Sequence, residues 1–264
     1  MTVENSTELW WKALLTGDGL EAPMRQVRHA LRLLPRPHAL RILQLALRRR
    51  RRARDASSGP GTFQDQRHLL QQVPGMASKN IGGVEIEVTL LFGDVRGSTS
   101  LAENMSPSEF SALISRFFGV TSKVLLKSNA WVDRLVGDQV IGMYLPFYVG
   151  EDHESKAVDA AKELLKRTGH DSTDGPWIPL GIGIHSGVAF IGAVGSEDAA
   201  TDITVLGDVP NTAARLSSAA GPGEIVISDD TFTKAGLDDD LEQRTLELKG
   251  KSEPLGVRVL TDYS

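Results

Sequence analysis

The chain has 264 residues, of which 41% are hydrophobic and 24% are charged, a globular composition that excludes wholesale disorder. It contains no cysteine, which excludes disulfide frameworks, thiolate zinc sites and cysteine nucleophiles. No apolar run approaches the roughly 18 residues of a membrane span. The N-terminus also lacks the basic-then-apolar pattern of a signal peptide, so we expect a soluble, cytoplasmic protein.

Charge is distributed unevenly along the chain. Residues 1–80 carry 14 basic and 6 acidic side chains, a net charge of +8, and the remainder carries −13. So steep a contrast indicates two segments with different roles. We therefore predict a basic, helical N-terminal extension and linker over 1–80 and one catalytic domain over 81–264.

Within the extension, apolar residues recur every three or four positions, which predicts helices over 8–15, 21–34 and 38–47. The third helix runs into five consecutive arginines, Arg48–Arg52. A nucleic-acid or anionic-membrane ligand is one interpretation of this run. No aromatic residues interleave with the arginines, so a solvated helix end whose cations complement the helix dipole is the interpretation we prefer.

From Val84 the pattern changes to alternating strands and amphipathic helices. Strands are predicted over 84–91, 130–136, 140–145, 224–228, 243–248 and 256–261, a strand pair hinged near Ser186 and Gly187 over 180–194, and helices over 107–127, 154–168 and 208–219. We take Asp208 as the N-cap of the last helix. The order βαββαβ with added strands predicts a ferredoxin-like α+β sandwich, with two helices covering one face of an antiparallel sheet.

Two carboxylates fall at turns beside strands of this predicted sheet. Asp94 closes the first strand and Asp138 lies at the tip of the 130–145 hairpin. Because the first strand and the central hairpin are neighbours in such a sheet, both carboxylates can reach one point. Paired carboxylates at a sheet end suit Mg²⁺ or Mn²⁺, with phosphate oxygens completing the coordination shell. The small-residue turn after Asp94, which includes Ser98 and Thr99, is suited to a polyphosphate.

A second group of polar residues lies on the helix predicted from position 208. Asn211 and Arg215 are four residues apart and therefore share one helix face. An amide beside a guanidinium suits a sugar oxygen and a phosphoryl oxygen.

These segments together resemble the class III nucleotidyl cyclases. The resemblance is carried by the runs Leu90–Thr99, Arg134–Asp138 and Thr204–Arg215, in matching order and separation, and by Lys249 in a Leu-Lys-Gly turn. It covers roughly residues 84–262 and leaves residues 1–80 uncovered. Its match in several motifs favours an active enzyme over the alternative of a catalytically inactive nucleotide-binding sensor.

The resemblance implies a role for each of these residues. Asp94 and Asp138, assisted by the Val95 carbonyl, would bind two divalent metal ions (Mg²⁺ or Mn²⁺). Asn211 would orient the ribose and Arg215 would stabilise charge on the α-phosphoryl group, while Lys249 would bind the terminal phosphates. The family's site lies at a head-to-tail homodimer interface, so one subunit would supply the aspartates and the other the remaining groups. The product would be a 3′,5′-cyclic nucleotide.

The two residues that the resemblance places at the base do not decide which nucleoside triphosphate is the substrate. Thr204 stands where the family's adenylyl cyclases accept a hydrogen bond from the adenine amine, which favours ATP. Arg134 stands where those enzymes usually have lysine, and its larger forked guanidinium favours a base edge with two acceptors. We therefore predict ATP as the substrate, keep UTP or CTP as the alternative, as in cyclases of bacterial anti-phage signalling, and place GTP third.

Overall fold

The computed structural model describes residues 81–194, 202–238, 240–248 and 251–263, together with the helical residues Glu8, Leu9, Trp11 and Lys12. The side chains of residues 133–136, 147, 148, 202 and 203 lie outside this description. The helices predicted over 21–34 and 38–47 and the arginine run likewise lie outside the described residues. The chain forms two compact units, one of 85–191 and 205–264 and the other of 1–84 and 192–204. The domain boundary at residue 80 stays a prediction.

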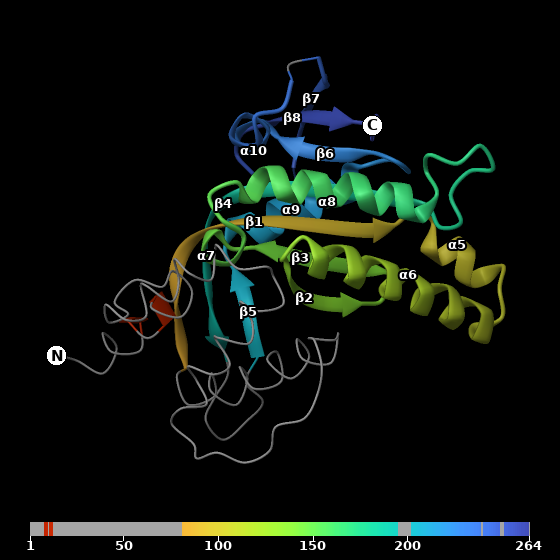
Figure 1. Ribbon diagram of the computed structural model, residues 1–264, viewed down its shortest axis with the longest axis horizontal. Coiled ribbons are helices and arrows are strands. Elements are labelled where there is room, and N and C mark those ends of the chain that lie inside the picture. The colour runs from red at the N-terminus through yellow and green to blue at the C-terminus, as the bar shows by residue number, and fades with distance from the viewer. Residues whose placement is uncertain are drawn as a thin grey trace, which may run out of the picture. The chain divides into compact units, whose positions relative to one another are not determined.

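The larger unit is built on a mixed α+β arrangement with one sheet (Figure 1). The described strands of the sheet are β1 (Gly82–Val95), β2 (Trp131–Val136), β3 (Gln139–Tyr144), β4 (Leu180–Val194), β5 (Asp202–Leu206), β6 (Ile225–Ser228), β7 (Glu242–Leu246) and β8 (Leu255–Leu260). Its described helices are α5 (Ser98–Glu103), α6 (Pro107–Lys127), α7 (Pro146–Val149), α8 (His153–Thr168), α9 (Asp208–Ala219) and α10 (Asp229–Ala235). The strand order is β2-β3-β1-β4-β6-β8-β7, and β5 pairs with β4.

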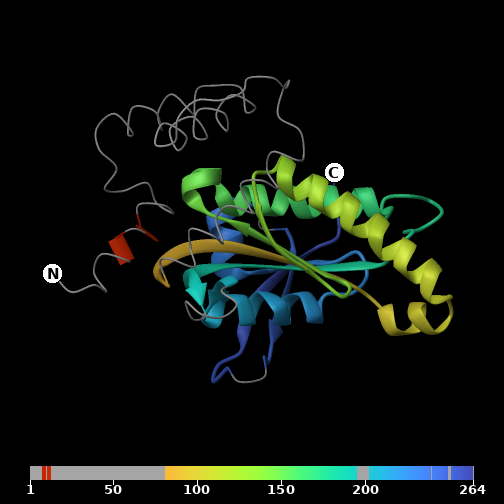
Figure 2. The same ribbon diagram turned by 90° about the horizontal axis from the view of Figure 1, so that it is seen from below.

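The predicted βαββαβ core is confirmed as β1-α6-β2-β3-α8-β4. As predicted, α6 and α8 lie side by side on one face of the sheet. Helix α9, for which no face was predicted, lies on the opposite face (Figure 2). The sheet is not wholly antiparallel, because β6 runs parallel to β4. The polar residues Asn211 and Arg215 of α9 are therefore on the face of the sheet opposite to α6 and α8.

Helix α6 begins where its sequence signals predict. Ser106 precedes it as the N-cap: its hydroxyl oxygen accepts a hydrogen bond from the Glu109 amide (3.3 Å). The Glu109 carboxylate in return accepts one from the Ser106 amide (2.9 Å). Pro107 occupies the first turn, where its missing N–H removes no intrahelical bond.

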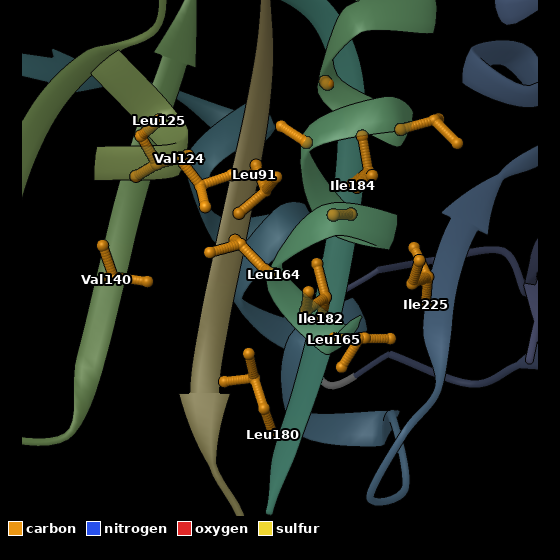
Figure 3. Packing of buried hydrophobic residues seen from close by; sticks show 14 of the residues in the cluster. Leu91, Val124, Leu125, Val140, Leu164, Leu165, Leu180, Ile182, Ile184 and Ile225 are labelled. Carbon is orange, nitrogen blue, oxygen red and sulfur yellow. The ribbon is translucent and has the colours of Figure 1, made fainter. Parts of the chain in front are cut away.

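The core lies between the sheet and the helix pair α6 and α8. Leu164 and Leu165 of α8 point onto Leu91 of β1 and onto Ile182 and its neighbours on β4 (Figure 3). The four named side chains are fully buried. Removal of each such side chain from water contributes roughly 1.5–3 kcal/mol, so this layer fixes the strands whose ends carry the site.

The prediction of two strands hinged near Ser186 and Gly187 is wrong. The structure has one continuous strand, β4, across residues 180–194. Ser186 is buried there: its hydroxyl is 2.7 Å from the Thr89 hydroxyl, and its amide donates to the Thr231 hydroxyl (2.8 Å). These partners hold an extended backbone through a position that the Ser-Gly pair had marked as a turn.

In the smaller unit, β1 and β4 approach closely. A Cβ added at Gly192 would lie 2.2 Å from the Gly82 carbonyl oxygen. Across the described part of the chain as a whole, we find no helix with the length and apolar character needed to cross a bilayer.

Candidate nucleotide and metal site

Asp94 and Asp138 lie at the ends of neighbouring strands. Asp94 of β1 pairs in register with Gln139 of β3, the residue after Asp138. The Val95 amide donates a hydrogen bond to the Asp138 carbonyl oxygen (3.2 Å). Both aspartates are half-buried. The sheet therefore brings together the two carboxylates that the sequence predicts to act as a pair.

The hairpin that carries Asp138 turns as predicted. Val136 pairs with Gln139 across a two-residue turn of Gly137 and Asp138. Gly137 has φ of 63°, in the left-handed region that glycine adopts without strain. The pairing of β2 and β3 shifts register between Val132 and Leu135, a bulge that contains the backbone of Arg134.

A cation that sequence analysis missed accompanies these carboxylates. The Arg96 guanidinium forms an ion pair with the Asp94 carboxylate, and its Nη1 donates to the Ser218 carbonyl oxygen (3.2 Å). Burial lowers the pKa of Arg96, and the negative charge of Asp138 opposes that shift. Arg96 therefore forms an ion pair with Asp94 and interacts electrostatically with Asp138. The signal in the sequence was a basic residue two positions after Asp94 in a small-residue turn.

The donor set fits a hard divalent cation. It offers two carboxylates on adjoining strand ends and the backbone carbonyl of Val95. Within the described ranges, no group of three or more histidine, aspartate or glutamate side chains is arranged so that it could hold a metal ion. A site with two protein carboxylates suits Mg²⁺, which keeps several ligand positions for water and substrate phosphates.

Helix α9 carries the second predicted group. Asn211 is exposed and its amide donates to the Gly207 carbonyl oxygen (3.0 Å). Arg215, one turn further on, is half-buried, and its guanidinium has no hydrogen bond or ion pair to any described residue. Neither side chain is bonded to Asp94 or Asp138 within this described single chain. The structure thus presents two sets of groups separately: the carboxylates and the amide–guanidinium pair.

The N-cap of α9 differs from the prediction by one residue. Asp208 is the first residue of α9, and Gly207 is the N-cap without a side-chain cap. The Asp208 carboxylate instead accepts from Thr212 (3.3 Å) and pairs with Lys251. The contact with Lys251 explains why the carboxylate does not turn back to cap the helix.

The buried face of α9 is pressed against β4. A Cβ added at Gly183 would lie 2.1 Å from the Ser217 amide nitrogen and 2.6 Å from the Ala213 carbonyl oxygen. Only glycine permits this approach of helix and strand backbones. The closeness of the two elements fixes the position of the face that bears Asn211 and Arg215.

The remaining predicted residues are placed less completely. Ser98 and Thr99 form the first turn of α5, directly after the carboxylate turn. Thr204 lies in β5 and is half-buried, within the smaller unit. Lys249 and the Arg134 side chain lie outside the described residues. The roles assigned to all of these residues stay predictions.

With this geometry in place, comparisons with known proteins identify the family. The sequence profile described as "Adenylate and Guanylate cyclase catalytic domain" matches residues 84–258, about two thirds of the chain. The chain belongs to this cyclase family. The predicted resemblance to class III cyclases is thereby confirmed.

Sequence relatives are distant. An uncharacterized Mycobacterium tuberculosis protein, Rv1319c, is 26% identical over 223 residues, which is 81% of this chain and 39% of that protein. An adenylate cyclase of Anabaena cylindrica is 25% identical over 205 residues, 69% of this chain and 39% of that enzyme. The chain thus spans about two fifths to one half of the length of the first relatives it matches.

Solved structures share the fold. The guanylyl cyclase Cya2 matches with a TM-score of 0.61 at 28% identity, over 68% of this chain and 93% of that one. The adenylyl cyclase CyaB from P. aeruginosa matches with a TM-score of 0.58 at 26% identity, over 67% of this chain and 94% of that one. Because one of these cyclases is a guanylyl and the other an adenylyl enzyme, the fold leaves the base open.

Proposed function

We propose that the chain converts ATP to 3′,5′-cyclic AMP and pyrophosphate. The observation that carries this proposal is the pairing of Asp94 with Asp138 at one end of the sheet, in a chain of the cyclase family. In the reaction, the ribose 3′-oxygen forms a bond to the α-phosphorus while the bond from that phosphorus to pyrophosphate breaks.

Asp94, Asp138 and the Val95 carbonyl would hold two divalent cations. Bound there, such ions would lower the pKa of the 3′-hydroxyl and neutralise charge on the departing pyrophosphate. Arg96 would hold the Asp94 carboxylate in place, since it contacts both the side chain and the backbone carbonyl of Asp94. Ser98 and Thr99 follow in the turn that would face the phosphates.

Helix α9 would act on the reacting groups. Asn211, exposed near the helix N-terminus, would orient the ribose for in-line attack. The Arg215 guanidinium would stabilise the negative charge that develops on the α-phosphoryl oxygens. Its lack of any bonded partner among described residues supports this role, because a donor already paired would have to break that pair first.

The active unit would be a homodimer. The carboxylate pair and the Asn211–Arg215 pair make no bond to each other in one described chain. A head-to-tail dimer would bring the carboxylates of one subunit to the helix of the other, twice. A monomer would then bind part of the substrate and not turn it over.

Two residues bear on which nucleotide is the substrate: Thr204 favours ATP, and Arg134 favours the pyrimidine alternative. Thr204, a hydrogen-bond acceptor, would receive the adenine amine, and adenylate cyclases are among the relatives. Arg134 supports the alternative substrate, UTP or CTP, because a forked donor prefers a base with two acceptors.

A turnover assay of the full chain tests the proposal. The protein is incubated with Mn²⁺ and separately with ATP, GTP, UTP and CTP, and the products are identified by mass. Cyclic AMP as the main product supports the proposal, and cyclic UMP or CMP supports the pyrimidine alternative. Absence of any cyclic product from a verified dimer would contradict an enzymatic function and favour a nucleotide-binding sensor.

A further inference from the structure

The Arg96 side chain joins the carboxylate end of the sheet to the C-terminal end of α9. Its guanidinium forms an ion pair with the Asp94 carboxylate, and Nε donates to the Asp94 carbonyl oxygen (3.3 Å). Nη1 of the same group donates to the Ser218 carbonyl oxygen (3.2 Å) in the last turn of the helix. One side chain therefore contacts a predicted metal ligand and also the backbone of the helix that carries Arg215.

The sequence explains why the Ser218 carbonyl oxygen accepts from a side chain. In an α-helix this oxygen would accept from the amide four residues later, but Pro222 has no N–H. A last-turn carbonyl left in this way needs a donor from elsewhere. The Arg96 guanidinium supplies one, and its positive charge also complements the negative end of the helix dipole.

The contact lies at a crowded junction of three elements. The Arg96 amide donates to the Pro179 carbonyl oxygen (2.9 Å), just before β4. A Cβ added at Gly181 in β4 would lie 2.8 Å from the Ala220 carbonyl oxygen and 3.2 Å from Arg96 Nε. The Arg96 side chain is only 18% exposed. A shift of the last turn of α9 away from Asp94 would therefore break a contact of Arg96.

The two ends of this connection serve different active sites in the proposed homodimer. Each site takes its carboxylates from one subunit and Asn211 and Arg215 from the other. Within one chain, Arg96 thus connects the carboxylates of one site to the helix of the second site. Arg215 is three residues before Ser218, about 4.5 Å along the helix axis, so a shift of the last turn also moves Arg215.

We propose that Arg96, besides holding Asp94, is a positioning residue for the other active site of the dimer, where it fixes α9 and with it Arg215. This inference rests on the proposed function, which assigns Asp94 and Arg215 to two different sites. Arg96 acts there through the helix backbone and is not itself a catalytic group.

Mixed dimers separate the two actions of Arg96. In the proposed arrangement, a dimer of one Asp138→Ala subunit and one Arg215→Ala subunit has a single intact site. The Arg215→Ala subunit supplies the carboxylates of that site, and the Asp138→Ala subunit supplies its α9. Arg96→Met is introduced into one subunit at a time, and the mixed dimers are isolated with two different affinity tags. The reference is the mixed dimer with Arg96 in both subunits.

The decisive variant carries Arg96→Met in the subunit that supplies only α9. Its kcat is expected to fall about tenfold, because misplacement by about 1 Å of a group that acts in the transition state lowers the rate. KM and the Mn²⁺ half-saturation are expected to change less than about twofold, since the carboxylates come from the other subunit. A merely structural role would not produce this separation.

Arg258 provides a matched control. Its guanidinium forms an ion pair with Asp229, and its side chain is 16% exposed, close to the value for Arg96. The pair joins β8 to α10, and the guanidinium lies over the Phe232 ring of α10. Arg258→Met in the subunit that supplies α9 should therefore leave kcat unchanged.

Hydrogen exchange gives a readout that needs no turnover. In the full chain, otherwise wild type, Arg96→Met is expected to speed amide exchange over residues 216–220 at least about tenfold, because the last turn of α9 loses a contact that holds it. Arg258→Met should leave exchange in this turn unchanged.

The outcomes separate this inference from the proposed function. An unchanged kcat for Arg96→Met in the subunit that supplies α9 would overturn the inference, and so would an equal fall for Arg258→Met. If the wild type or the reference mixed dimer forms no cyclic nucleotide, the proposed function fails by itself. Exchange then decides: faster exchange in Arg96→Met alone supports fixation of α9 by Arg96, and unchanged exchange overturns it.

Discussion

The amide of Val95 donates a hydrogen bond to the carbonyl oxygen of Asp138, and this one bond joins the ends of the two segments that carry the paired carboxylates. Asp94, the residue before Val95, is paired in register with Gln139. Two acidic residues far apart in the sequence are thereby held at one sheet end by backbone pairing. The same end is the one that we assign to metal and triphosphate.

Removal of either carboxylate should eliminate cation binding. We expect Asp94→Asn and Asp138→Asn to lower turnover by at least about a thousandfold, because a divalent cation supplies much of the charge stabilisation in phosphoryl transfer. Both variants should also lose the rise in thermal midpoint that Mn²⁺ gives the wild type. Asp174→Asn, at an exposed loop position, is the matched control. A normal Mn²⁺ shift in both site variants would contradict the assignment.

Close packing of α9 on β4 should limit substitution at Gly183. We expect Gly183→Ala to destabilise the fold by about 3 kcal/mol or more, since its methyl group would overlap the backbone of Ser217. Gly119 in α6 is the control, because a Cβ there meets nothing within 4 Å. Gly119→Ala should stabilise by about 0.5–1 kcal/mol. Urea denaturation measures both changes, and equal stability of the two variants would refute this packing.

Much of the fold was predictable because local signals agreed. The apolar stripe of α6 and its Ser106–Glu109 capping box both predict a helix, and a Gly-Asp pair between β2 and β3 predicts their hairpin. The error at Ser186 has a physical cause: its buried hydroxyl finds a partner on β1 and its backbone amide donates to a hydroxyl on α10, so the residue stays in a strand. Those partners are remote in sequence and cannot be inferred from local pattern.

The candidate site, like the fold, was predictable only in part. Motif spacing gave Asp94 and Asp138 as a pair, and the sheet pairing places them side by side. Arg96 was missed because its contact with Ser218 depends on how α9 packs. Asp208 was expected to cap its helix, but its tertiary partner Lys251 determines its position instead.

Acid should destabilise the fold through His185. Burial lowers its pKa from 6.5 to about 4, and its Nδ1 lies 2.7 Å from the Ser228 hydroxyl. The unfolded chain then binds a proton that the folded chain does not, so stability is lost as pH falls from 6.5 towards 4. We expect His185→Gln to lose about 2 kcal/mol less than the wild type between about pH 7 and pH 5. Urea denaturation at both pH values measures the free energy of unfolding. An equal loss of stability in the variant and the wild type would contradict this account.

The base preference should depend on position 134. We expect Arg134→Lys to raise the ratio of kcat/KM for ATP over that for UTP about tenfold, because a single ammonium donor replaces a fork that suits two acceptors. Thr204→Ala should lower the same ratio by removing the acceptor for the adenine amine. Ratios unchanged in both variants would show that other residues select the base.

Mixing of two inactive variants tests the central claim most directly. Asp138→Ala lacks a metal ligand and Arg215→Ala lacks the α-phosphoryl contact, so each homodimer should be inactive. Subunits mixed in equal amounts should recover about one quarter of wild-type turnover, because half of the dimers are mixed and each has one intact site. That result would establish a cyclase whose site is shared between subunits. An inactive mixture in which mixed dimers are demonstrated, beside an active wild type, would contradict the shared site.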